Sequence, residues 1–329
     1  EEELKKTLKV PGLSLFNNGT IALVVAIQSM RLSGEVITTP FTFPATTHVL
    51  PWNNITPVFC DVDEDTLTLD PKKMESLMTA KTTGILGVHV YGMPCDVFSI
   101  QEIADRYGLR VIYDAAHAFG TEIDGRGIGT FGDVSMFSFH STKLFHTLEG
   151  GALTFNDPHL KPRIDLLKNF GIKNEEEVVM PGINGKLNEV QAAIGLINLR
   201  YLDEERRKRQ LIVETYRQNL AGIEGIKVIE IPENVRNSYQ YFMIRVTEEF
   251  GVNRDYIHTE LKKYNVITRK YFYPLCSDYS CYKQLPSADP ANLPVAHKIV
   301  KQVLCLPLYG NLKLDEVEII CSLIKNLKK

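Results

Sequence analysis

The chain has 329 residues, 44% of them hydrophobic and 23% charged, which is typical of a globular protein and excludes a disordered or fibrous chain. Its 37 Lys and Arg residues nearly balance its 40 Asp and Glu residues, and no basic stripe stands out, so we expect no nucleic-acid partner. The longest apolar stretch, residues 21–30, is half the roughly 20 residues of a membrane helix, and no signal peptide opens the chain, so we expect a cytoplasmic protein without membrane contact.

In the first half of the chain, short β-branched stretches alternate with longer helical patterns, which is typical of an α/β fold. The predicted strands are residues 35–40, 56–62, 83–90, 109–114, 134–139 and 152–155. The predicted helices are residues 20–30, 45–50, 71–78 and 99–107. Because several strands are apolar throughout, we expect a mostly parallel central sheet with helices on both faces.

The pattern changes at Lys186, where apolar residues spaced three and four apart predict one long helix that ends at Leu220. The charged run "DEERRKRQ" within it is most simply a solvated helix face, with an anion site as the alternative. Further strands, helices and a Pro-rich loop at 273–293 follow. We therefore expect a large α/β domain over residues 1–205 and a small C-terminal α+β domain over 206–329.

The six cysteines are scattered, form no CxxC pair and lie mostly in apolar segments, so we interpret them as buried, reduced thiols. Cys276 and Cys281 are near each other, but no His/Cys pair at zinc spacing follows them. The sequence therefore predicts no metal site.

Polar residues just beyond parallel strands are the candidates for a binding site, because such sheets bind ligands at the carboxyl ends of their strands. The first candidate is "NNGTIAL", where Gly19 and Thr20 open a helix. Free amides, the helix dipole and the Thr20 hydroxyl favour a phosphate group there. An ordinary capping turn is an equally good interpretation.

The second candidate is "VIYDAAHAFG", in which an apolar strand ends at Asp114 and His117 follows three residues later. A carboxylate at a buried strand end needs a cationic partner, although Asp114 could simply cap a helix. The next strand ends at Ser138 and is followed by Lys143. An Asp and then a Lys on neighbouring strands are the partners that pyridoxal phosphate (PLP) requires for its ring nitrogen and its aldehyde.

The loop that carries Lys143 contains other polar groups and the Gly150-Gly151 pair. Ser138 would lie near the phosphate, and the two glycines would allow close backbone approach. The alternative is a surface lysine in an ordinary turn. His140 and His146 are expected to stabilise the loop by hydrogen bonds, with proton transfer as the less favoured role.

Several motifs together resemble the DegT/StrS-type nucleotide-sugar aminotransferases, which are PLP enzymes of fold type I. They are "NNGTIAL", "EVITTPFTFPATTH", "HVYGMPCD", "VIYDAAHAFG", "FSFHSTKLFHTLEGGAL", "PGINGKLNEVQAAIGL" and "LPVAHKIVKQVLCLPLYGNL". They occur in the family's order and cover nearly the whole chain. The resemblance implies a PLP fold type I domain followed by a smaller C-terminal domain.

The resemblance also implies a role for each candidate residue. Lys143 matches the lysine that bonds covalently to the cofactor, and Asp114 matches the carboxylate on the pyridine nitrogen. His117 matches a position beside the ring oxygen. Thr20, the Gly19 backbone and Ser138 match phosphate contacts.

Two further roles rest on the resemblance alone. Phe43 matches the aromatic residue that stacks on the cofactor ring. Asn184 matches a residue that reaches the phosphate of the other subunit's cofactor. The implied assembly is a homodimer with shared active sites.

The family resemblance implies an amino-acid donor, usually L-glutamate, and a keto sugar linked to a nucleoside diphosphate, here expected to be a dTDP-4-keto-6-deoxyhexose. The product would supply amino sugars for polysaccharides or glycosylated metabolites. The form "SFHxTK…EGG" favours amination at C4, and C3 is the alternative. A different PLP chemistry, such as desulfuration or decarboxylation, would need an activated cysteine. A cofactor-binding regulator would need a nucleic-acid-binding module.

The sequence departs from the family pattern in two places. The chain opens with "EEELKKTLKVPGLSLF", whereas relatives usually have a few dozen earlier residues, so we expect a fragment or short form. In "YFYPLCSD", Cys276 stands where relatives often have histidine, and we expect it near the substrate entrance.

Overall fold

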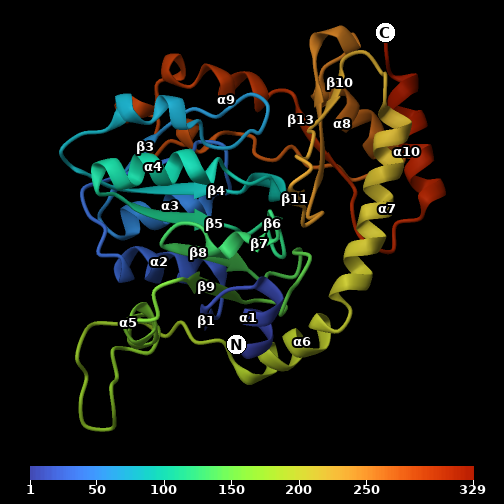
Figure 1. Cartoon of the computed structure of the whole chain (residues 1–329). Coiled ribbons are helices and arrows are strands. Elements are labelled where there is room, and N and C mark those ends of the chain that lie inside the picture. Colours follow the sequence, from blue (N-terminus) through green and yellow to red (C-terminus); the bar gives the residue numbers. More distant parts are fainter.

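The computed structural model describes residues 1–329 and is built around a seven-stranded sheet of order β1-β9-β8-β5-β4-β2-β3 (Figure 1). Its strands are β1 (Gly12–Phe16), β2 (Glu35–Thr38), β3 (Thr56–Phe59), β4 (Thr82–Val88), β5 (Arg110–Asp114), β8 (Val134–Ser138) and β9 (Gly151–Phe155). Strands β3, β2, β4, β5 and β8 are parallel neighbours, and β9 pairs antiparallel with both β8 and β1. The six strands predicted from the sequence and the mostly parallel sheet are confirmed.

Strand β1 was not predicted, because "GLSLF" is short and contains a glycine and a serine that weaken the strand pattern. Its register with β9 pairs Phe16 with Gly151, and the β8 register pairs Gly151 with Ser138. The start of the next helix is therefore held at the same level of the sheet as the end of β8.

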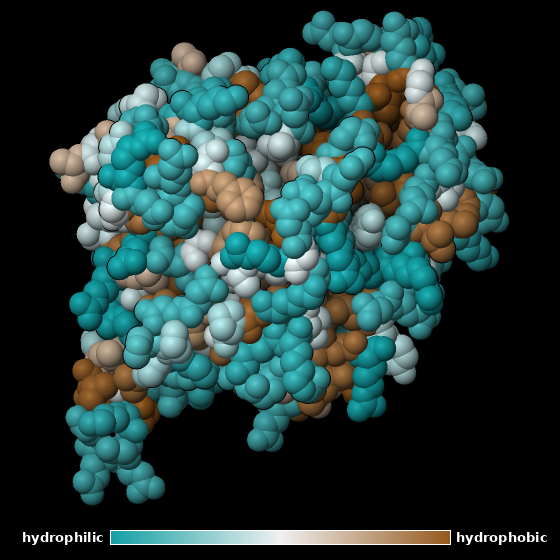
Figure 2. All heavy atoms as spheres, viewed as in Figure 1, coloured by the Kyte–Doolittle hydropathy of each residue, from teal (hydrophilic) through white to brown (hydrophobic).

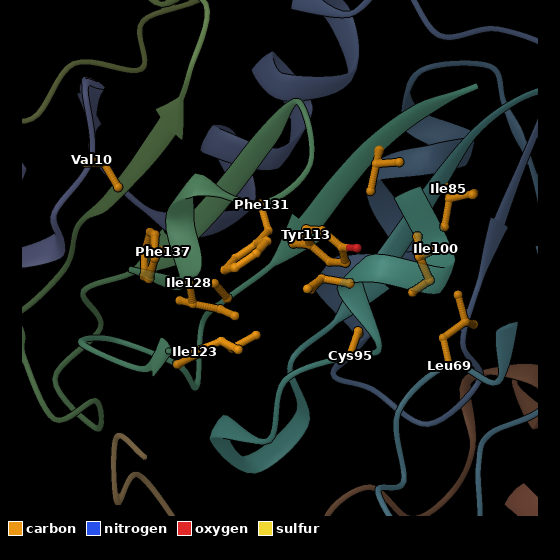
Figure 3. Packing of buried hydrophobic residues seen from close by; sticks show 14 of the residues in the cluster. Val10, Leu69, Ile85, Cys95, Ile100, Tyr113, Ile123, Ile128, Phe131 and Phe137 are labelled. Carbon is orange, nitrogen blue, oxygen red and sulfur yellow. The ribbon is translucent and has the colours of Figure 1, made fainter. Parts of the chain in front are cut away.

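Helices cover both faces of this sheet. One face packs on α2 (Gly19–Ser29), α3 (Pro44–Trp52) and α5 (Leu160–Leu167), and the other on α4 (Val97–Tyr107). Figure 3 shows part of the second layer, where Tyr113 of β5 lies near Phe131 and Ile100 of α4 lies near Ile85 of β4. The predicted helices at 20–30, 45–50 and 99–107 are confirmed within a few residues at their ends.

The predicted helix at 71–78 is wrong. Two short 3₁₀ turns, Pro71–Lys73 and Glu75–Leu77, stand there instead. The Asp70 side chain caps the start of this segment by accepting a hydrogen bond from the Lys72 amide, but Met74 ends the first turn before an α-helix can form. A capping signal alone does not determine the length of the helix that follows.

The predicted single helix from 186 to 220 is also wrong. It is two helices, α6 (Glu189–Leu199) and α7 (Leu202–Leu220), which change direction between them (Figure 1). At the break, the amides of Arg200 and Tyr201 bond to carbonyls three residues back, which closes α6 in a tight turn. Neither proline nor glycine marks this break, so no local sequence signal predicts it.

The charged run at the start of α7 is only partly a solvated face. The Arg206 and Arg209 side chains are buried, contrary to prediction. Arg206 donates to the Asn237 carbonyl at 2.6 Å, and Arg209 pairs with Glu205 at 2.8 Å. Arg206 thereby joins the start of α7 to the segment that follows β11.

The C-terminal region contains a second sheet of order β10-β12-β13, made of Ile226–Val228, Phe242–Val246 and Val303–Leu306. It packs on α7, α8 (Arg254–Lys263) and α10 (Leu314–Asn326). The remaining helices and strands are α1 (Glu2–Leu8), α9 (Pro294–Ile299), β6 (Glu122–Ile123), β7 (Arg126–Gly127) and β11 (Val235–Arg236), with short 3₁₀ turns at Val90–Gly92, Ile128–Thr130, Glu248–Phe250, Cys276–Asp278, Pro286–Ala288 and Pro290–Asn292. We propose two domains that meet near the start of α7; the boundary between residues 205 and 206 stays a prediction.

Five of the six cysteines are buried as predicted, but Cys281 is exposed. Cys276 is fully buried, and its thiol donates to the Thr42 carbonyl at 3.4 Å. The expected position of Cys276 near the substrate entrance stays a prediction. None of the helices combines the length and apolar character needed to cross a membrane.

Two surfaces expose large apolar side chains. On α6, Val190, Leu196 and Ile197 are each more than half exposed, and only Gly195 of that helix is buried. A loop at 171–180 projects from the body (Figure 1), and Figure 2 shows apolar residues at its base and a hydrophilic tip. Both surfaces lack a partner within one chain.

Candidate active site

One cavity of about 580 Å³ opens at the carboxyl ends of β5 and β8. Seven of the eight predicted site residues line it, namely Gly19, Thr20, Phe43, Asp114, His117, Ser138 and Lys143. A volume of this size suits a small-molecule ligand. The position also agrees with the general rule for ligands in open parallel sheets.

The first end of the cavity is the start of α2. The Asn18 side chain caps the Ile21 amide at 2.8 Å, which leaves the Gly19 and Thr20 amides without an intrahelical partner. A Cβ on Gly19 would lie 3.0 Å from the Met136 sulfur and 3.2 Å from the Ser138 Cβ. Two free amides and the Ser138 hydroxyl therefore meet at a helix N-terminus, a combination that fits a phosphate.

The glycine pair after Lys143 packs against this end. A Cβ on Gly151 would lie 2.8 Å from both the Asn18 carbonyl carbon and the Gly19 nitrogen. Only glycine allows β9 to approach the start of α2 so closely. The predicted close approach is present, although the partner is the backbone of Asn18 and Gly19.

The second end of the cavity is built around Asp114. Its carboxylate is buried and accepts hydrogen bonds from the Thr46 hydroxyl at 2.7 Å and the Ala116 amide at 3.0 Å. Burial raises the pKa of Asp114, while these two bonds and the charge of Lys143 act in the opposite direction. Asp114 has no ion pair within the chain, so a cationic ring nitrogen would supply its missing partner.

His117 lies against the same end. Its Nδ1 accepts the Tyr91 amide at 3.2 Å, so Nε2 carries the proton when the ring is neutral. Burial lowers the pKa of His117 well below its ordinary value, and the charge of Lys143 adds to this effect. A neutral His117 therefore has one N–H donor, on Nε2. Its ring stacks on the Phe272 ring, with 5.6 Å between the two centroids.

Lys143 lies in an irregular loop and is partly buried. Its amide donates to the His140 carbonyl at 2.9 Å. Burial lowers the pKa of the Lys143 amine to about 8, and the charge of Asp114 partly opposes that shift. A substantial neutral fraction near pH 8 makes this amine a nucleophile, which an ordinary surface lysine is not.

Both histidines of this loop form hydrogen bonds, as predicted. His140 Nδ1 lies 2.9 Å from the Thr142 hydroxyl, and the Asn198 side chain donates to the His146 carbonyl at 2.8 Å. His140 Nε2 also faces Glu149 at 3.5 Å, and both side chains line the cavity.

Asn184 is the one predicted site residue outside this cavity. Its side-chain oxygen accepts a hydrogen bond from Lys186 at 2.8 Å, beside Asn169. Within a single chain the structure does not bring Asn184 to Lys143.

Several residues that line the cavity or support its side chains were missed by sequence reasoning. Thr46, which donates to Asp114, lies within the quoted motif "FTFPATTH" and carried no signal of its own. Tyr241, Tyr271 and Phe272 come from the C-terminal region and line the same cavity. Only the tertiary fold brings them there, so no local spacing could have identified them.

The site as a whole fits PLP. Free amides and a hydroxyl lie at one end, an unpaired buried carboxylate lies at the other, and an amine with a lowered pKa lines the same cavity and interacts with that carboxylate. No group of three or more His, Cys, Asp or Glu side chains gathers to hold a metal ion.

Comparison with known proteins agrees with this geometry. An Escherichia coli protein named dTDP-4-amino-4,6-dideoxy-D-glucose transaminase is 45% identical over 325 residues, which are 98% of this chain and 88% of the relative. The solved structure of DesI in the presence of its TDP-sugar product has a TM-score of 0.94 at 35% identity, covering 99% of this chain and 83% of DesI. A Streptococcus pneumoniae relative whose structure is called a PLP-form has a TM-score of 0.93 at 26% identity, covering 99% of this chain and 89% of that one.

These likenesses confirm the predicted family and the PLP fold type I architecture. The model of the DegT/DnrJ/EryC1/StrS aminotransferase family matches residues 1–325. The chain therefore belongs to the DegT/DnrJ/EryC1/StrS aminotransferase family and is a sugar aminotransferase.

Proposed function

We propose that this sugar aminotransferase uses PLP to transfer the amino group of L-glutamate to C4 of a dTDP-linked 4-keto-6-deoxyhexose. The observation that carries the proposal is the shared cavity of Lys143 and Asp114, an amine of lowered pKa and a buried carboxylate without an ion pair. The name of the E. coli relative supports the nucleotide and the C4 position.

In this proposal, residues at the two ends of the cavity bind different parts of the cofactor. The Gly19 and Thr20 amides and the Ser138 hydroxyl hold the phosphate, and Asp114 keeps the ring nitrogen protonated. His117 donates its Nε2–H to the ring oxygen. When bound, PLP supplies an aldehyde that receives the amino group and a ring that accepts electrons from the substrate.

Lys143 has two tasks in this proposal. Its neutral amine would hold the cofactor covalently, and the freed amine would move a proton at the substrate carbon. A pKa of about 8 suits both tasks, because the amine accepts and returns a proton near neutral pH.

The net reaction is balanced without another redox partner. The glutamate Cα loses a hydrogen and its amino group and becomes the ketone of 2-oxoglutarate, while the sugar carbonyl carbon gains both. Two electrons pass from the first carbon to the second. Water enters at one carbonyl and leaves from the other.

The first experiment is an absorption spectrum of the purified protein with PLP, before and after L-glutamate, followed by NMR of the product from dTDP-4-keto-6-deoxyglucose. We expect a band near the visible edge that requires Lys143, changes with glutamate, and leads to an amine on C4. Lys143→Ala should lack the band, and Lys81→Ala, which changes an exposed lysine, should keep it.

Three results would contradict parts of the proposal. A band that glutamate does not change would mean another donor or another PLP chemistry. An amine on C3 would favour the alternative regiochemistry. A stable complex with PLP that neither exchanges nitrogen nor forms product would favour a cofactor-binding protein without catalysis.

We further propose a homodimer with shared active sites. The exposed apolar residues of α6 and of the 171–180 loop need a partner, and Asn184, beside that loop, lies outside its own chain's cavity. A mixture of Lys143→Ala and Asn184→Ala proteins tests this assembly. In mixed dimers of a shared-site enzyme one site is intact, so about a quarter of the sites should regain activity. No gain over the separate variants would mean independent sites.

A further inference from the structure

The connection between β11 and β12, residues 237–241, is anchored to the cavity wall at several points. Ser238 donates to the His117 carbonyl at 2.6 Å, and the Asn237 side chain donates to the Gly92 carbonyl at 3.3 Å. A Cβ on Gly92, whose φ is +86°, would lie 2.4 Å from the Ser238 hydroxyl. A glycine is therefore required where this connection crosses the large sheet.

Gln240 of this connection contacts the loop of Lys143 from both sides. Its side-chain oxygen accepts the Leu144 amide at 2.6 Å, and its side-chain nitrogen donates to the Thr142 carbonyl at 2.9 Å. These two peptide groups directly flank Lys143. The Gln240 side chain is 5% exposed, so neither of its bonds competes freely with water.

Other contacts hold the loop farther from Lys143, since the Thr147 amide donates to the Phe139 carbonyl at 2.9 Å and the Asn198 side chain donates to the His146 carbonyl at 2.8 Å. The segment around Lys143 is neither helix nor strand, and the Lys143 amide itself bonds only to the nearby His140 carbonyl. The Leu144 amide would be left without a partner in a buried environment if Gln240 were shortened. Gln240 is thus the side chain that bonds to both peptide groups flanking Lys143.

We propose that Gln240 is a positioning residue that holds the Lys143 amine in the cavity through the peptide groups on either side of it. This inference rests on the proposed function, because it concerns the reactivity of Lys143. Gln240 is joined to Tyr241, which lines the cavity and packs edge-on against His117 at 4.9 Å between ring centroids. Two consecutive residues of the C-terminal region therefore act on the cavity: Gln240 positions Lys143, and Tyr241 forms part of the wall beside His117.

The test compares wild-type protein with Gln240→Ala and Gln240→Glu, in the cofactor-free and PLP-loaded full chain. Gln240→Glu keeps an oxygen opposite the Leu144 amide but places another against the Thr142 carbonyl. Gln302→Ala is the matched control, because Gln302 also makes two side-chain hydrogen bonds, both from Arg245, and lies outside the cavity.

Three readouts separate positioning from a structural role. Amide hydrogen exchange of residues 140–148 should rise about tenfold in Gln240→Ala and less in Gln240→Glu. The pKa of Lys143, from competitive labelling of the cofactor-free protein against pH, should move upward as the amine gains water. The remaining ionisable groups of the cavity are Asp114, His117, His140, Glu149, Tyr241 and Tyr271, and none of them is changed. The kcat of the glutamate half-reaction should fall about tenfold with little change in KM.

The inference would be overturned if Gln240→Ala lowered the melting temperature like Gln302→Ala but left loop exchange, the Lys143 pKa and kcat at wild-type values. A failure of the proposed function would look different. In that case wild-type protein itself would show no Lys143-dependent band or no response to glutamate, whereas the exchange and labelling results could still follow Gln240.

Discussion

The two ends of the cavity handle charge in opposite ways. At the start of α2, the free amides of Gly19 and Thr20 and the hydroxyls of Thr20 and Ser138 can donate hydrogen bonds to an anionic group of a ligand. Around Asp114 and Lys143, burial disfavours the charged form of both protein groups. The first end suits the binding of an anion, and at the second end the Lys143 amine, whose pKa is lowered to about 8, can exchange protons near neutral pH.

The largest expected effect comes from removing the charge of the Asp114 carboxylate, at the second end of the cavity. We expect Asp114→Asn to slow the glutamate half-reaction roughly 10²- to 10³-fold, because the ring nitrogen loses its anionic partner. The pKa of Lys143 should fall below about 8, since the Asp114 charge raises it. Stopped-flow absorption and a pH titration measure the two effects.

The matched control is Asp133→Asn, since Asp133 accepts the Val111 amide at the far end of β5. A half-reaction in Asp114→Asn within a few-fold of wild type would contradict the assigned role.

At the first end, beside the start of α2, we expect a substitution of Ser138 to weaken the binding of PLP and to change proton transfer little. Ser138→Ala removes a hydrogen bond to a charged group, which contributes roughly 1.5–3 kcal/mol, so PLP should bind about tenfold to a hundredfold more weakly. The measurement is the dissociation constant in a Lys143→Ala background, where no covalent bond contributes.

Ser135→Ala is the control for this change, because Ser135 lies on the same strand and bonds to the Phe131 carbonyl instead. Equal affinities for the two variants would place the phosphate elsewhere.

The lysine end should show a characteristic pH dependence. Only the neutral amine bonds to PLP, so with a pKa of about 8 the rate of bond formation should rise tenfold per pH unit below 8 and level off above it. An ordinary lysine would still be gaining rate at pH 10. Rapid-mixing absorption between pH 6 and 10 checks this, and a continuous rise to pH 10 would contradict the lowered pKa.

The smallest effect should come from the hydroxyl behind Asp114. Thr46→Val removes the 2.7 Å bond that lowers the pKa of Asp114, so that pKa should rise further and the half-reaction should slow a few-fold. Carboxyl ¹³C NMR follows the titration. Thr47→Val is the control, because the Thr47 hydroxyl makes no bond to Asp114, and matching shifts in both variants would argue against the Thr46 bond.

The sequence predicted much of the large sheet because its strands are short, apolar and separated by helical patterns. It also predicted that Asp114 and Lys143 share a site, because Asp114 ends one apolar strand and Lys143 follows the next, at the carboxyl ends of the parallel strands. It could not predict Gln240, which bonds to the loop of Lys143, or Phe272, which lines the cavity, because both lie more than 90 residues beyond Lys143 along the chain. The break after α6 and the burial of Arg206 were missed for the same reason: they depend on tertiary contacts.

The register of β1 and β9 bears on how the enzyme is made. Phe16, Gly151 and Ser138 lie side by side, so the backbone of the phosphate end is complete once Gly151 has left the ribosome. Tyr241 and Phe272, which line the rest of the cavity, lie later in the chain, in the C-terminal region. The segments of the proposed phosphate end are therefore synthesised before the residues that close the cavity beside His117. The order of synthesis thus runs from the proposed binding end to the rest of the wall.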